Sequence, residues 1–244
     1  MSEFPMVYVP SKGRPDSKTA DLLSASKLPF KMVVEPQEAK QYKNFDCLVL
    51  PENNRGIAYV RNWIQENATT EWYWMLDDDI TAFYQTVSRK NVKVEASRAL
   101  EGSFNLFGHL PSVGQASLEY QQFAWSATKT IKFNGYCDVC VCIHRQRTYR
   151  CMYRDYVNLK EDRDFTLQVL SSGYRTARVC KFSFAAPKNG SNEGGLKREY
   201  DTQGKEALAS KRMAELWPGI CTPVTKKDGR QDVKINWRAF TVKR

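Results

Sequence analysis

The chain has 244 residues, 42% of them hydrophobic and 12% aromatic, which excludes an intrinsically disordered protein and is enough for one large domain. It carries 37 Lys and Arg against 27 Asp and Glu, a formal net charge of +10, so the composition favours either a polyanionic partner, nucleic acid first, or a solubilising surface. With seven cysteines, no signal-peptide core and no apolar run of membrane-spanning length, we expect a cytoplasmic protein with reduced thiols and no membrane contact.

Strands and helices alternate over the first 80 residues. Short apolar runs predict strands over residues 6–9, 31–34, 47–50 and 71–76. Helical patterns predict a helix that Asp16 caps and Pro29 ends, a helical turn over 39–42, and a helix over 57–67 that Gly56 opens. This order is typical of an α/β fold in which a mixed, mostly parallel sheet is flanked by helices. The carboxyl ends of the four strands then lie along one edge.

Charged side chains follow each of these four strands. Asp77-Asp78-Asp79 ends the fourth strand, and because burying unpaired carboxylates is costly, these side chains either face water in an acidic turn or hold a divalent cation. The residues that follow the other three strands are Lys12 and Arg14, then Glu35, then Arg55. Basic loops beside a metal held by carboxylates suit a nucleoside diphosphate, whereas the alternative is that these lysine and arginine side chains are ordinary surface charges.

Residues 81–128 show no clear period. They interleave four glycines and prolines with seven aromatic residues, which are Phe83, Tyr84, Phe104, Phe107, Tyr120, Phe123 and Trp125. We expect a loop-rich insertion with short helices over the mouth of the site. Its aromatic side chains either stack on a base or sugar or form a small satellite core.

A strand is predicted over residues 131–147. Its alternation places Cys137 on one face, and Cys140, Cys142 and His144 on the other face with Asp138. Cysteine and histidine are zinc ligands, but this spacing on a flat strand seldom surrounds one ion. We therefore expect buried structural cysteines rather than a metal site.

Two later segments are rich in basic residues. Residues 145–154 contain two tyrosines, no acid and four arginines, which are Arg145, Arg147, Arg150 and Arg154. Arginine interleaved with aromatics suits phosphate contact and base stacking, and a solvated hairpin is the equal alternative. Residues 222–244 hold seven basic and two acidic residues, including Lys226 and Lys227, and we expect a basic extension that ends in a strand over 233–240.

A helix is predicted over residues 159–170, with Gly173 after its end. Glu161 and Asp162 fall at its N-terminus, where the helix dipole favours carboxylates. Either they are ordinary capping residues, or one of them is directed into the site and takes a proton from an attacking hydroxyl. A strand over 178–186, a polar loop over 188–195 and a helix over 204–217 complete the predicted elements.

Four motifs in this order resemble the glycosyltransferases of the GT-A fold. They are Pro10-Ser11-Lys12-Gly13-Arg14, the segment from Asn54 through Gly56 to Arg61-Asn62, the DxD motif Asp77-Asp78-Asp79, and Glu161-Asp162 followed by Gly173-Tyr174. The resemblance runs from Val7 to about Ala186. The small size, the basic tail and the loop Gly190-Ser191-Asn192-Glu193-Gly194-Gly195 look most like the phage TET-associated glycosyltransferases.

This resemblance implies roles for particular residues. A UDP-sugar donor would contact Pro10, Ser11, Lys12, Arg14, Glu35, Arg55, Gly56, Arg61, Asp77 and Asp78. Asp77 and Asp79 would hold Mn²⁺ or Mg²⁺, and Asp162 would be the catalytic base if the reaction inverts the configuration at the anomeric carbon. Many GT-A enzymes take a further metal ligand from a C-terminal histidine, but this chain has none after His144, so Asn189, Asn192 or water would replace it. DNA would contact Arg145, Arg147, Arg150, Arg154, Lys226 and Lys227.

Together these features predict a single GT-A, Rossmann-like domain over residues 1–221, with a nucleotide-sugar-binding half (1–80), an acceptor-side half (81–221) and a basic extension (222–244). The expected function is metal-dependent transfer of a sugar from a UDP-sugar to a hydroxymethylated pyrimidine in DNA. The alternatives are a GT-A enzyme with a glycan, lipid or protein acceptor, a nucleotidyltransferase, and a nucleic-acid-binding module without catalysis. The oligomeric state stays open.

Overall fold

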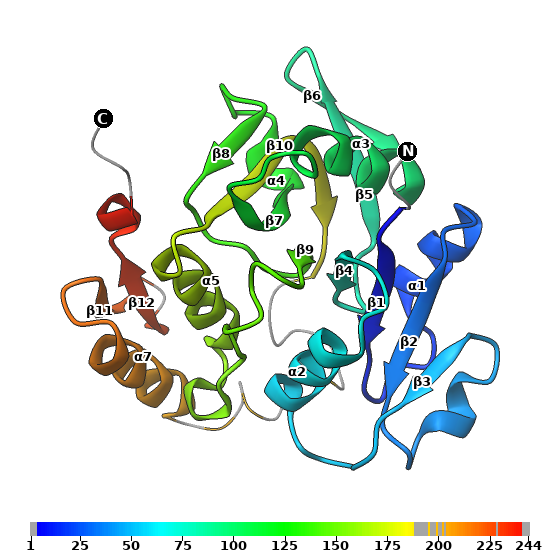
Figure 1. Cartoon of the computed structure of the whole chain (residues 1–244), viewed down its shortest axis with the longest axis horizontal. Helices are drawn as coiled ribbons and strands as arrows, with labels where there is room; N and C mark the ends of the chain where they lie inside the picture. Colours follow the sequence, from blue (N-terminus) through cyan, green and yellow to red (C-terminus); the bar gives the residue numbers. More distant parts are fainter. Residues whose placement is uncertain are drawn as a thin grey trace.

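A mixed sheet runs through the centre of the molecule, with helices on both of its faces (Figure 1). The computed structural model describes residues 4–187, 195, 199, 202, 204–227 and 229–240. The path of the sheet is β3-β2-β1-β4-β9-β7-β10-β5-β6, and β8 pairs with β10. None of the helices in these described ranges is long and apolar enough to cross a bilayer.

The first half of the sheet is the parallel unit that the sequence predicts. Its elements are β1 (Met6–Pro10), α1 (Lys18–Ala25), β2 (Phe30–Val34), the 3₁₀ helix η1 (Ala39–Tyr42), β3 (Cys47–Val49), α2 (Ile57–Asn67) and β4 (Trp72–Leu76). β1 pairs in parallel with β2 and β4, and β2 with β3. One detail of the prediction is wrong: Ser17 rather than Asp16 caps α1, because the Ser17 hydroxyl accepts a hydrogen bond from the Ala20 amide.

The segment that we expected to be loop-rich is regular structure, so that expectation is wrong. It contains β5 (Ala82–Val87), β6 (Lys90–Val94), α3 (Ala96–Phe107), β7 (Val113–Tyr120) and the short helix α4 (Gln121–Ala124). α3 buries one helical face and covers β10, and β7 is a central strand of the sheet. Phe107 is fully buried against Trp72 and Trp74, whereas Phe123 and Trp125 are exposed.

The predicted strand over 131–147 is two shorter strands. β8 (Ile131–Phe133) pairs with β10, and β9 (Cys140–His144) lies antiparallel between β4 and β7. The predicted placement of the cysteines is correct: Cys140 and Cys142 pack in the core on one face of the sheet, and Cys137 packs in the core on the other. The alternation itself is interrupted at Val139, which has φ of +57° and packs on the face of Cys140 and Cys142. All seven cysteines are free thiols, and all but Cys47 are buried.

Each face of the sheet has its own hydrophobic core because strand residues alternate between the faces. Val7 and Trp74 pack with α1 and α3, while Tyr8 and Tyr73, their neighbours in sequence, pack with α2 and α5. The elements that complete this region are the 3₁₀ helix η2 (Asp155–Val157), α5 (Glu161–Ser171) and β10 (Arg175–Ala185).

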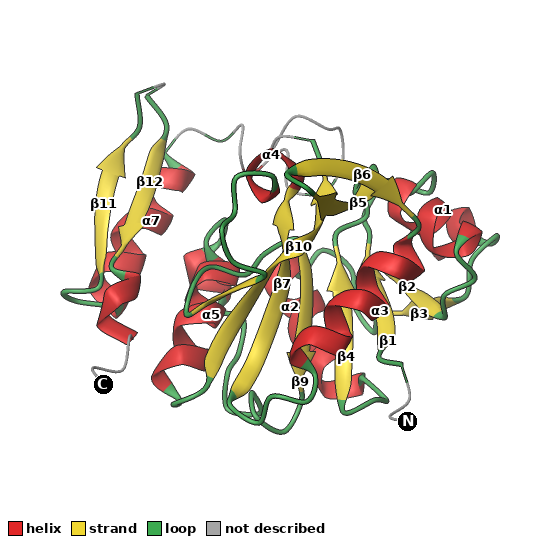
Figure 2. Ribbon diagram, turned by 90° about the horizontal axis from the view of Figure 1, so that it is seen from above, coloured by secondary structure: helices red, strands yellow, loops and turns green. Residues whose placement is uncertain are grey.

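A small C-terminal unit, residues 204–240, lies beside α5 (Figure 2). It consists of α7 (Lys205–Leu216), an antiparallel pair of strands β11 (Cys221–Thr225) and β12 (Gln231–Ile235), and the 3₁₀ helix η3 (Trp237–Phe240). The single strand expected over 233–240 is therefore wrong, since the chain turns into η3 after Ile235. β11 begins before residue 222, so the unit includes residues on both sides of the expected boundary.

Three kinds of contact hold the C-terminal unit to the larger domain. Met213 and Val233 share a small core with Leu167 of α5. The Trp217 indole donates a hydrogen bond of 2.8 Å to the Asp164 carboxylate. Asp232 forms ion pairs with Arg163 and Lys160, so the basic extension is docked through its own buried acid.

Candidate active site

The three aspartates follow β4 at the carboxyl edge of the parallel strands, as predicted, but they have different surroundings. Asp78 is buried and accepts hydrogen bonds of 2.6 Å from the Ser11 hydroxyl and 2.6 Å from Nη1 of Arg14. Burial raises the pKa of the Asp78 carboxyl, and these two contacts oppose the shift. Asp78 therefore holds the first loop, residues 11–14, against the end of β4.

Asp77 and Asp79 remain partly exposed on either side of Asp78. Asp79 lies 3.3 Å from Nη1 of Arg14, and Asp77 lies 3.3 Å from Nη2 of Arg61. Burial raises the pKa of Asp77 to about 7, the neighbouring aspartates add to the rise, and Arg61 opposes it. Three adjacent carboxylates thus carry negative charge that these arginines offset only in part.

The donor set at Asp77 and Asp79 fits a hard divalent cation. Both side chains offer accessible carboxylate oxygens, which Mg²⁺ and Mn²⁺ prefer. No three His, Cys, Asp or Glu side chains within the described ranges are grouped closely enough to surround an ion by themselves. Such a cation would therefore take its remaining ligands from water and from a bound phosphate group, as Mg²⁺ commonly does. Asn189 and Asn192, the expected alternatives, lie outside the described residues.

The predicted donor-binding residues Lys12 and Glu35 lie together at the ends of β1 and β2. Lys12 Nζ lies 2.8 Å from Glu35 Oε1 and 2.7 Å from Asn54 Oδ1, and Glu35 is buried. The Asn54 amide also donates to Glu35, so this carboxylate ties the segments after β1, β2 and β3 to one another. The Lys12 side chain keeps 42% of its surface exposed and can reach a ligand above this loop.

The remaining predicted donor residues extend this edge. Pro10 is the last residue of β1, and Gly56 precedes α2 with φ of +83°, a conformation that favours glycine. Arg55 is exposed and forms an ion pair with Glu52 at 2.6 Å. The Gly195 amide donates a hydrogen bond to the Lys12 carbonyl, so residue 195 lies against the first loop although 183 positions separate the two in sequence.

Asp162 and Asp77 line the same cleft, although 85 positions separate them in sequence. The other residues that line it are Arg61, Met75, Gln115, Cys137, Asp138, Val139, Val141 and Tyr153. Asp162 is in the first turn of α5, where its carboxylate accepts a hydrogen bond of 2.6 Å from the Tyr136 hydroxyl and one of 2.7 Å from the Arg163 amide. Its neighbour Glu161 is buried and pairs with Arg61 at 2.9 Å.

Arg61 links the two carboxylate sites. One of its guanidinium nitrogens contacts Glu161 of α5 and another contacts Asp77 after β4, and the group lies 5.4 Å from the centre of the Tyr153 ring. The sequence predicts Arg61 as a donor-site residue, and the structure places it beneath both Asp77 and Asp162. It therefore fixes α5 relative to the end of β4.

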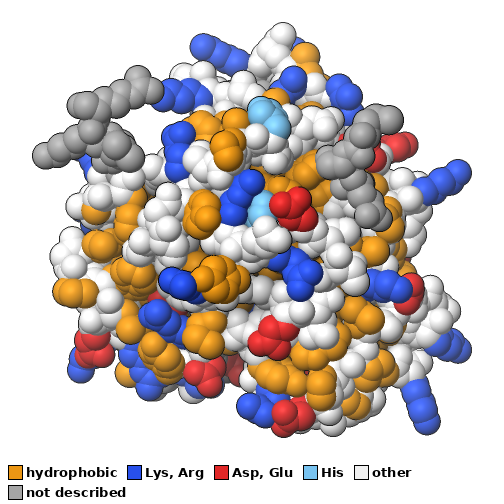
Figure 3. Space-filling view, in the orientation of Figure 1, with side chains coloured by type: hydrophobic (Ala, Val, Ile, Leu, Met, Phe, Trp, Pro, Cys, Tyr) orange, Lys and Arg blue, Asp and Glu red, His pale blue; other side chains and the backbone are white. Residues whose placement is uncertain are grey.

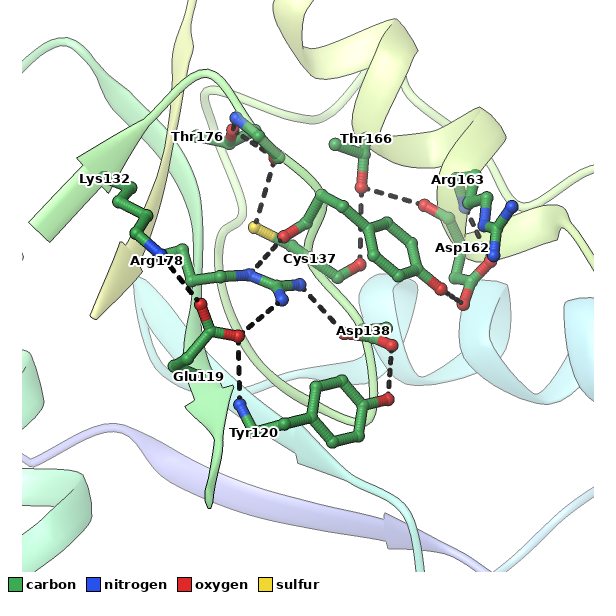
Figure 4. A network of polar contacts seen from close by, with 12 residues as sticks. Glu119, Tyr120, Lys132, Cys137, Asp138, Asp162, Arg163, Thr166, Thr176 and Arg178 are labelled. Atoms are coloured by element: carbon green, nitrogen blue, oxygen red, sulfur yellow. Dashed lines mark hydrogen bonds and ion pairs between the residues drawn. The ribbon is translucent and has the colours of Figure 1, made fainter. Parts of the chain in front are cut away.

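A buried polar network behind the cleft was not predicted from the sequence (Figure 4). Arg178 of β10 pairs with Asp138 at 3.0 Å and with Glu119 at 3.0 Å, and it donates to the Tyr136 carbonyl. The Tyr120 hydroxyl donates to Asp138 at 2.5 Å. Burial raises the pKa of Asp138, and Arg178 opposes this rise. The only sign of this network in the sequence was Asp138, an acidic residue predicted to lie on the same strand face as Cys140 and Cys142.

The predicted DNA-binding arginines do not gather at the cleft. β9 runs antiparallel to β4, with His144 opposite Trp72, so residues 145–150 follow the end of β9 that is farthest from Asp77. Arg147 donates hydrogen bonds to the carbonyl groups of Leu110 (2.9 Å) and Val113 (2.7 Å), which makes it a structural residue. Residues 145–150 therefore lie away from the cleft, and their contact with DNA stays a prediction.

The other predicted DNA-binding residues lie in different parts of the molecule, and each makes its own contacts. Arg154 pairs with the buried Asp164 at 3.4 Å, and Arg145 contacts the backbone of Glu66. Arg150 is exposed and lies over the exposed Tyr149 ring. Lys226 pairs with Asp232, and Lys227 is exposed near the turn between β11 and β12.

Comparison with known proteins identifies the family and the fold. A family model described as TET-Associated Glycosyltransferase matches residues 5–195, so the C-terminal unit lies beyond the match. A search of the curated proteins finds no match.

Solved structures of glycosyltransferases share the fold. Staphylococcus aureus TarS 1–349 has a TM-score of 0.53 and 12% identity, over 88% of this chain and 66% of that one. TarS 1–349 in complex with UDP-GlcNAc has a TM-score of 0.52 and 12% identity, over 88% and 67%. Glucosyl-3-phosphoglycerate synthase from Mycobacterium tuberculosis, in complex with Mn²⁺, UDP and phosphoglyceric acid, has a TM-score of 0.54 and 7% identity, over 94% and 85%. The chain thus spans just under two thirds of TarS 1–349, and the predicted GT-A fold is confirmed.

Proposed function

The chain belongs to the TET-associated glycosyltransferase family, and from this premise we propose that it transfers a sugar from a UDP-sugar to the hydroxyl group of a hydroxymethylated pyrimidine in DNA. The observation that carries the proposal is the single cleft lined by Asp77, on the donor side, and Asp162, on the acceptor side. Transfer between two substrates requires both groups within reach of one reacting centre.

The donor side is built for a nucleoside diphosphate. Lys12 and Arg14 bring positive charge to the rim, and Ser11 is fixed by Asp78, so the first loop is held in one position before a ligand arrives. TarS and glucosyl-3-phosphoglycerate synthase have been crystallised with UDP, which supports UDP as the nucleotide here. Asp77 and Asp79 would hold Mg²⁺ or Mn²⁺, and such an ion would stabilise the negative charge of the departing diphosphate.

Asp162 is the proposed general base. In a single displacement, the hydroxyl oxygen of the acceptor forms a bond to the anomeric carbon while the bond from that carbon to the diphosphate breaks. The hydroxyl proton moves to the Asp162 carboxylate, and UDP leaves with the bonding electron pair. Tyr136 fixes the orientation of this carboxylate through its 2.6 Å hydrogen bond.

DNA is proposed as the acceptor on the basis of the family and the excess of positive charge. A base inside a duplex is stacked, so its hydroxymethyl group reaches a cleft only when the nucleotide is turned out of the helix. A glycan, lipid or protein acceptor remains the competing proposal on the same fold.

The experiment is a transfer assay with mass spectrometry of the products. The protein is incubated with Mn²⁺, a panel of UDP-sugars, and DNA that contains hydroxymethylcytosine or hydroxymethyluracil, and the nucleosides are then weighed. A nucleoside heavier by one sugar residue is expected with one donor of the panel. The matched controls are unmodified DNA and the Asp162→Asn variant, and both should give no product.

One result would overturn the acceptor proposal. If the protein transfers sugar from a UDP-sugar to a glycan or peptide, and no modified nucleoside forms with any donor, DNA is not the substrate. If no donor is turned over with either metal, Asp77 and Asp162 do not form an active site.

A further inference from the structure

A surface beside the cleft combines positive charge with exposed aromatic and apolar side chains. We call it the basic rim; it consists of residues 87–93, from the β5–β6 hairpin, and residues 121–132, from α4 to β8. These two segments contain no Asp or Glu and five basic residues, which are Arg89, Lys90, Lys93, Lys129 and Lys132.

The two segments of the basic rim adjoin each other and the cleft. The Asn91 side chain donates a hydrogen bond of 2.7 Å to the Gln121 carbonyl, which joins the hairpin to α4 (Figure 2). Tyr120, directly before α4, donates to Asp138, and Asp138 lines the cleft together with Asp162. A DNA strand that lies on the basic rim would therefore be next to Asp162, the proposed general base.

Exposed rings and apolar side chains mark this surface. Phe123 and Trp125 each keep 53% of their surface exposed, and Val87 and Val92 on the hairpin keep 48% and 50%. The Trp125 indole N–H donates to the Gln122 carbonyl at 3.0 Å, which holds the ring in place. Exposed large apolar side chains cost solubility, so a group of them beside cations indicates a binding surface. Aromatic rings and cations together are what single-stranded nucleic acid requires.

The cations of the rim are available for a ligand. Within the described part of the chain, no carboxylate forms an ion pair with Arg89, Lys90, Lys93 or Lys129, and Lys132 alone pairs, with Glu119 at 3.4 Å. Over the face that Figure 3 shows, Lys and Arg side chains lie among acidic and hydrophobic ones. The basic rim combines four cations that have no ion-pair partner among the described residues with the exposed rings of Phe123 and Trp125.

We propose that the basic rim is the docking surface for the acceptor DNA, with the cations on the phosphates and Trp125 and Phe123 against unstacked bases near the turned-out nucleotide. The inference rests on the proposed function, since it takes DNA as the acceptor, and it locates the contact away from the Arg145 to Arg150 segment. An anionic glycan could also satisfy the cations, but it has no flat bases to stack on exposed rings.

The test measures binding of fluorescent single-stranded and duplex DNA by anisotropy at several salt concentrations, without a donor. Lys90→Ala/Lys129→Ala should weaken binding at least 10-fold and reduce the slope of log K against log salt by about 2, because each phosphate contact contributes about 1. Trp125→Ala should weaken single-strand binding roughly 10-fold and leave the slope unchanged. The matched control is Tyr149→Ala/Arg150→Ala, an exposed aromatic and cation at the opposite edge of the sheet, which should bind like wild type.

The outcomes separate this inference from the proposed function. If wild type binds DNA and the folded rim variants bind it equally well, the rim is not the docking surface and the function is untouched. If the rim variants lose dextran sulfate binding as strongly as DNA binding while Trp125→Ala loses nothing, the rim is a general anion site and the inference fails. If wild type neither binds nor modifies DNA, the proposed function fails first. Unfolding temperatures of all variants show which are folded.

Discussion

Tyr136 donates a 2.6 Å hydrogen bond to Asp162, and Trp237 of the C-terminal unit stacks on the same Tyr136 ring at 6.4 Å between ring centres. The proposed base is thus oriented by a residue that the far end of the chain supports. We predict that Tyr136→Phe lowers kcat about 10-fold, because a carboxylate that is free to rotate is less often aligned with the attacking hydroxyl.

Rates of sugar transfer between pH 5 and 9 check this prediction. Asp162→Asn is the reference for complete loss, and Tyr149→Phe, which alters an exposed tyrosine, is the matched control. A Tyr136→Phe protein with wild-type kcat would show that the hydrogen bond has no catalytic role.

Asp78 and Asp79 should respond differently to the same substitution. Asp78→Asn should lower the free energy of unfolding by about 3 kcal/mol, because it removes the buried charge that Ser11 and Arg14 contact. Asp79→Asn should change stability little and weaken Mn²⁺-dependent binding of UDP roughly 100-fold. Urea unfolding and calorimetric titration with UDP, each with and without EDTA, measure the two effects. If the Asp79→Asn variant and wild type bind UDP with equal affinity, Asp79 is not a ligand of the proposed metal ion.

Arg147 should prove to be a stability residue. Its guanidinium donates to two carbonyl groups and lies 5.5 Å from the centre of the Trp72 ring. Arg147→Ala should therefore lower the free energy of unfolding by about 2 kcal/mol, because the carbonyl oxygens lose their partner. Its DNA affinity should match that of Arg150→Ala, which alters an exposed side chain and should fold like wild type. A selective loss of DNA binding in Arg147→Ala, without loss of stability, would show that Arg147 contacts DNA, as predicted from the sequence.

The docking of the C-terminal unit should depend on pH through Asp232. Burial alone would raise its pKa, but the hydrogen bond from Lys226 and the charges of Arg163 and Lys160 outweigh burial and hold the pKa of Asp232 well below its ordinary value. Because the folded state lowers this pKa, the ion pairs stabilise the protein fully above about pH 4, the value for an unfolded aspartate, and less at lower pH.

Asp232→Asn should accordingly lower the free energy of unfolding at pH 7 by about 2 kcal/mol, since three cations lose their partner. The difference from wild type should shrink as the pH falls below about 4. Thermal unfolding at pH 7 and pH 3.5 measures it, with Asp46→Asn as a control, because Asp46 is exposed and pairs only with Lys31. A difference that stays constant with pH would show that the charge of Asp232 does not hold the unit.

The parallel half of the fold was predictable because its signals are local. Apolar runs such as those of β1 and β4 end in polar residues, and each strand is followed by a helical pattern, so the carboxyl edge and the residues on it follow from topology alone. Lys12, Arg14, Glu35 and the aspartates were found in this way, whereas Arg61, inside α2, was predicted only from the family resemblance.

Residues 81–128 were misjudged because their glycines serve packing rather than turns. Gly102 lies within α3, where a Cβ would come within 2.5 Å of the Phe182 ring, and Gly114 lies within β7 against Tyr174 and Val169. A sequence pattern shows only the glycine, which is typical of loops. The need for glycine at position 102 becomes clear only in the folded structure, where α3 packs closely on Phe182 of β10.

The network around Asp162 could not be predicted for another reason. Tyr136 and Asp138 come from the loop before β9, Arg178 comes from the distant strand β10, and none of the three belongs to a recognisable motif. They meet only because β10 inserts between β7 and β5 in the sheet. Contacts of this kind depend on the complete sheet order, which local periodicity does not specify.

The distribution of the cysteines makes the natural protein suitable for labelling at one position. Six thiols are buried, and Cys47 in β3 is the half-buried one, so a thiol reagent applied to the folded protein reaches Cys47 first. Cys47 Sγ contacts the Tyr42 carbonyl, and the Tyr42 hydroxyl bonds to Ser11 in the first loop. An environment-sensitive dye on Cys47 would therefore report nucleotide binding at that loop without any engineered residue.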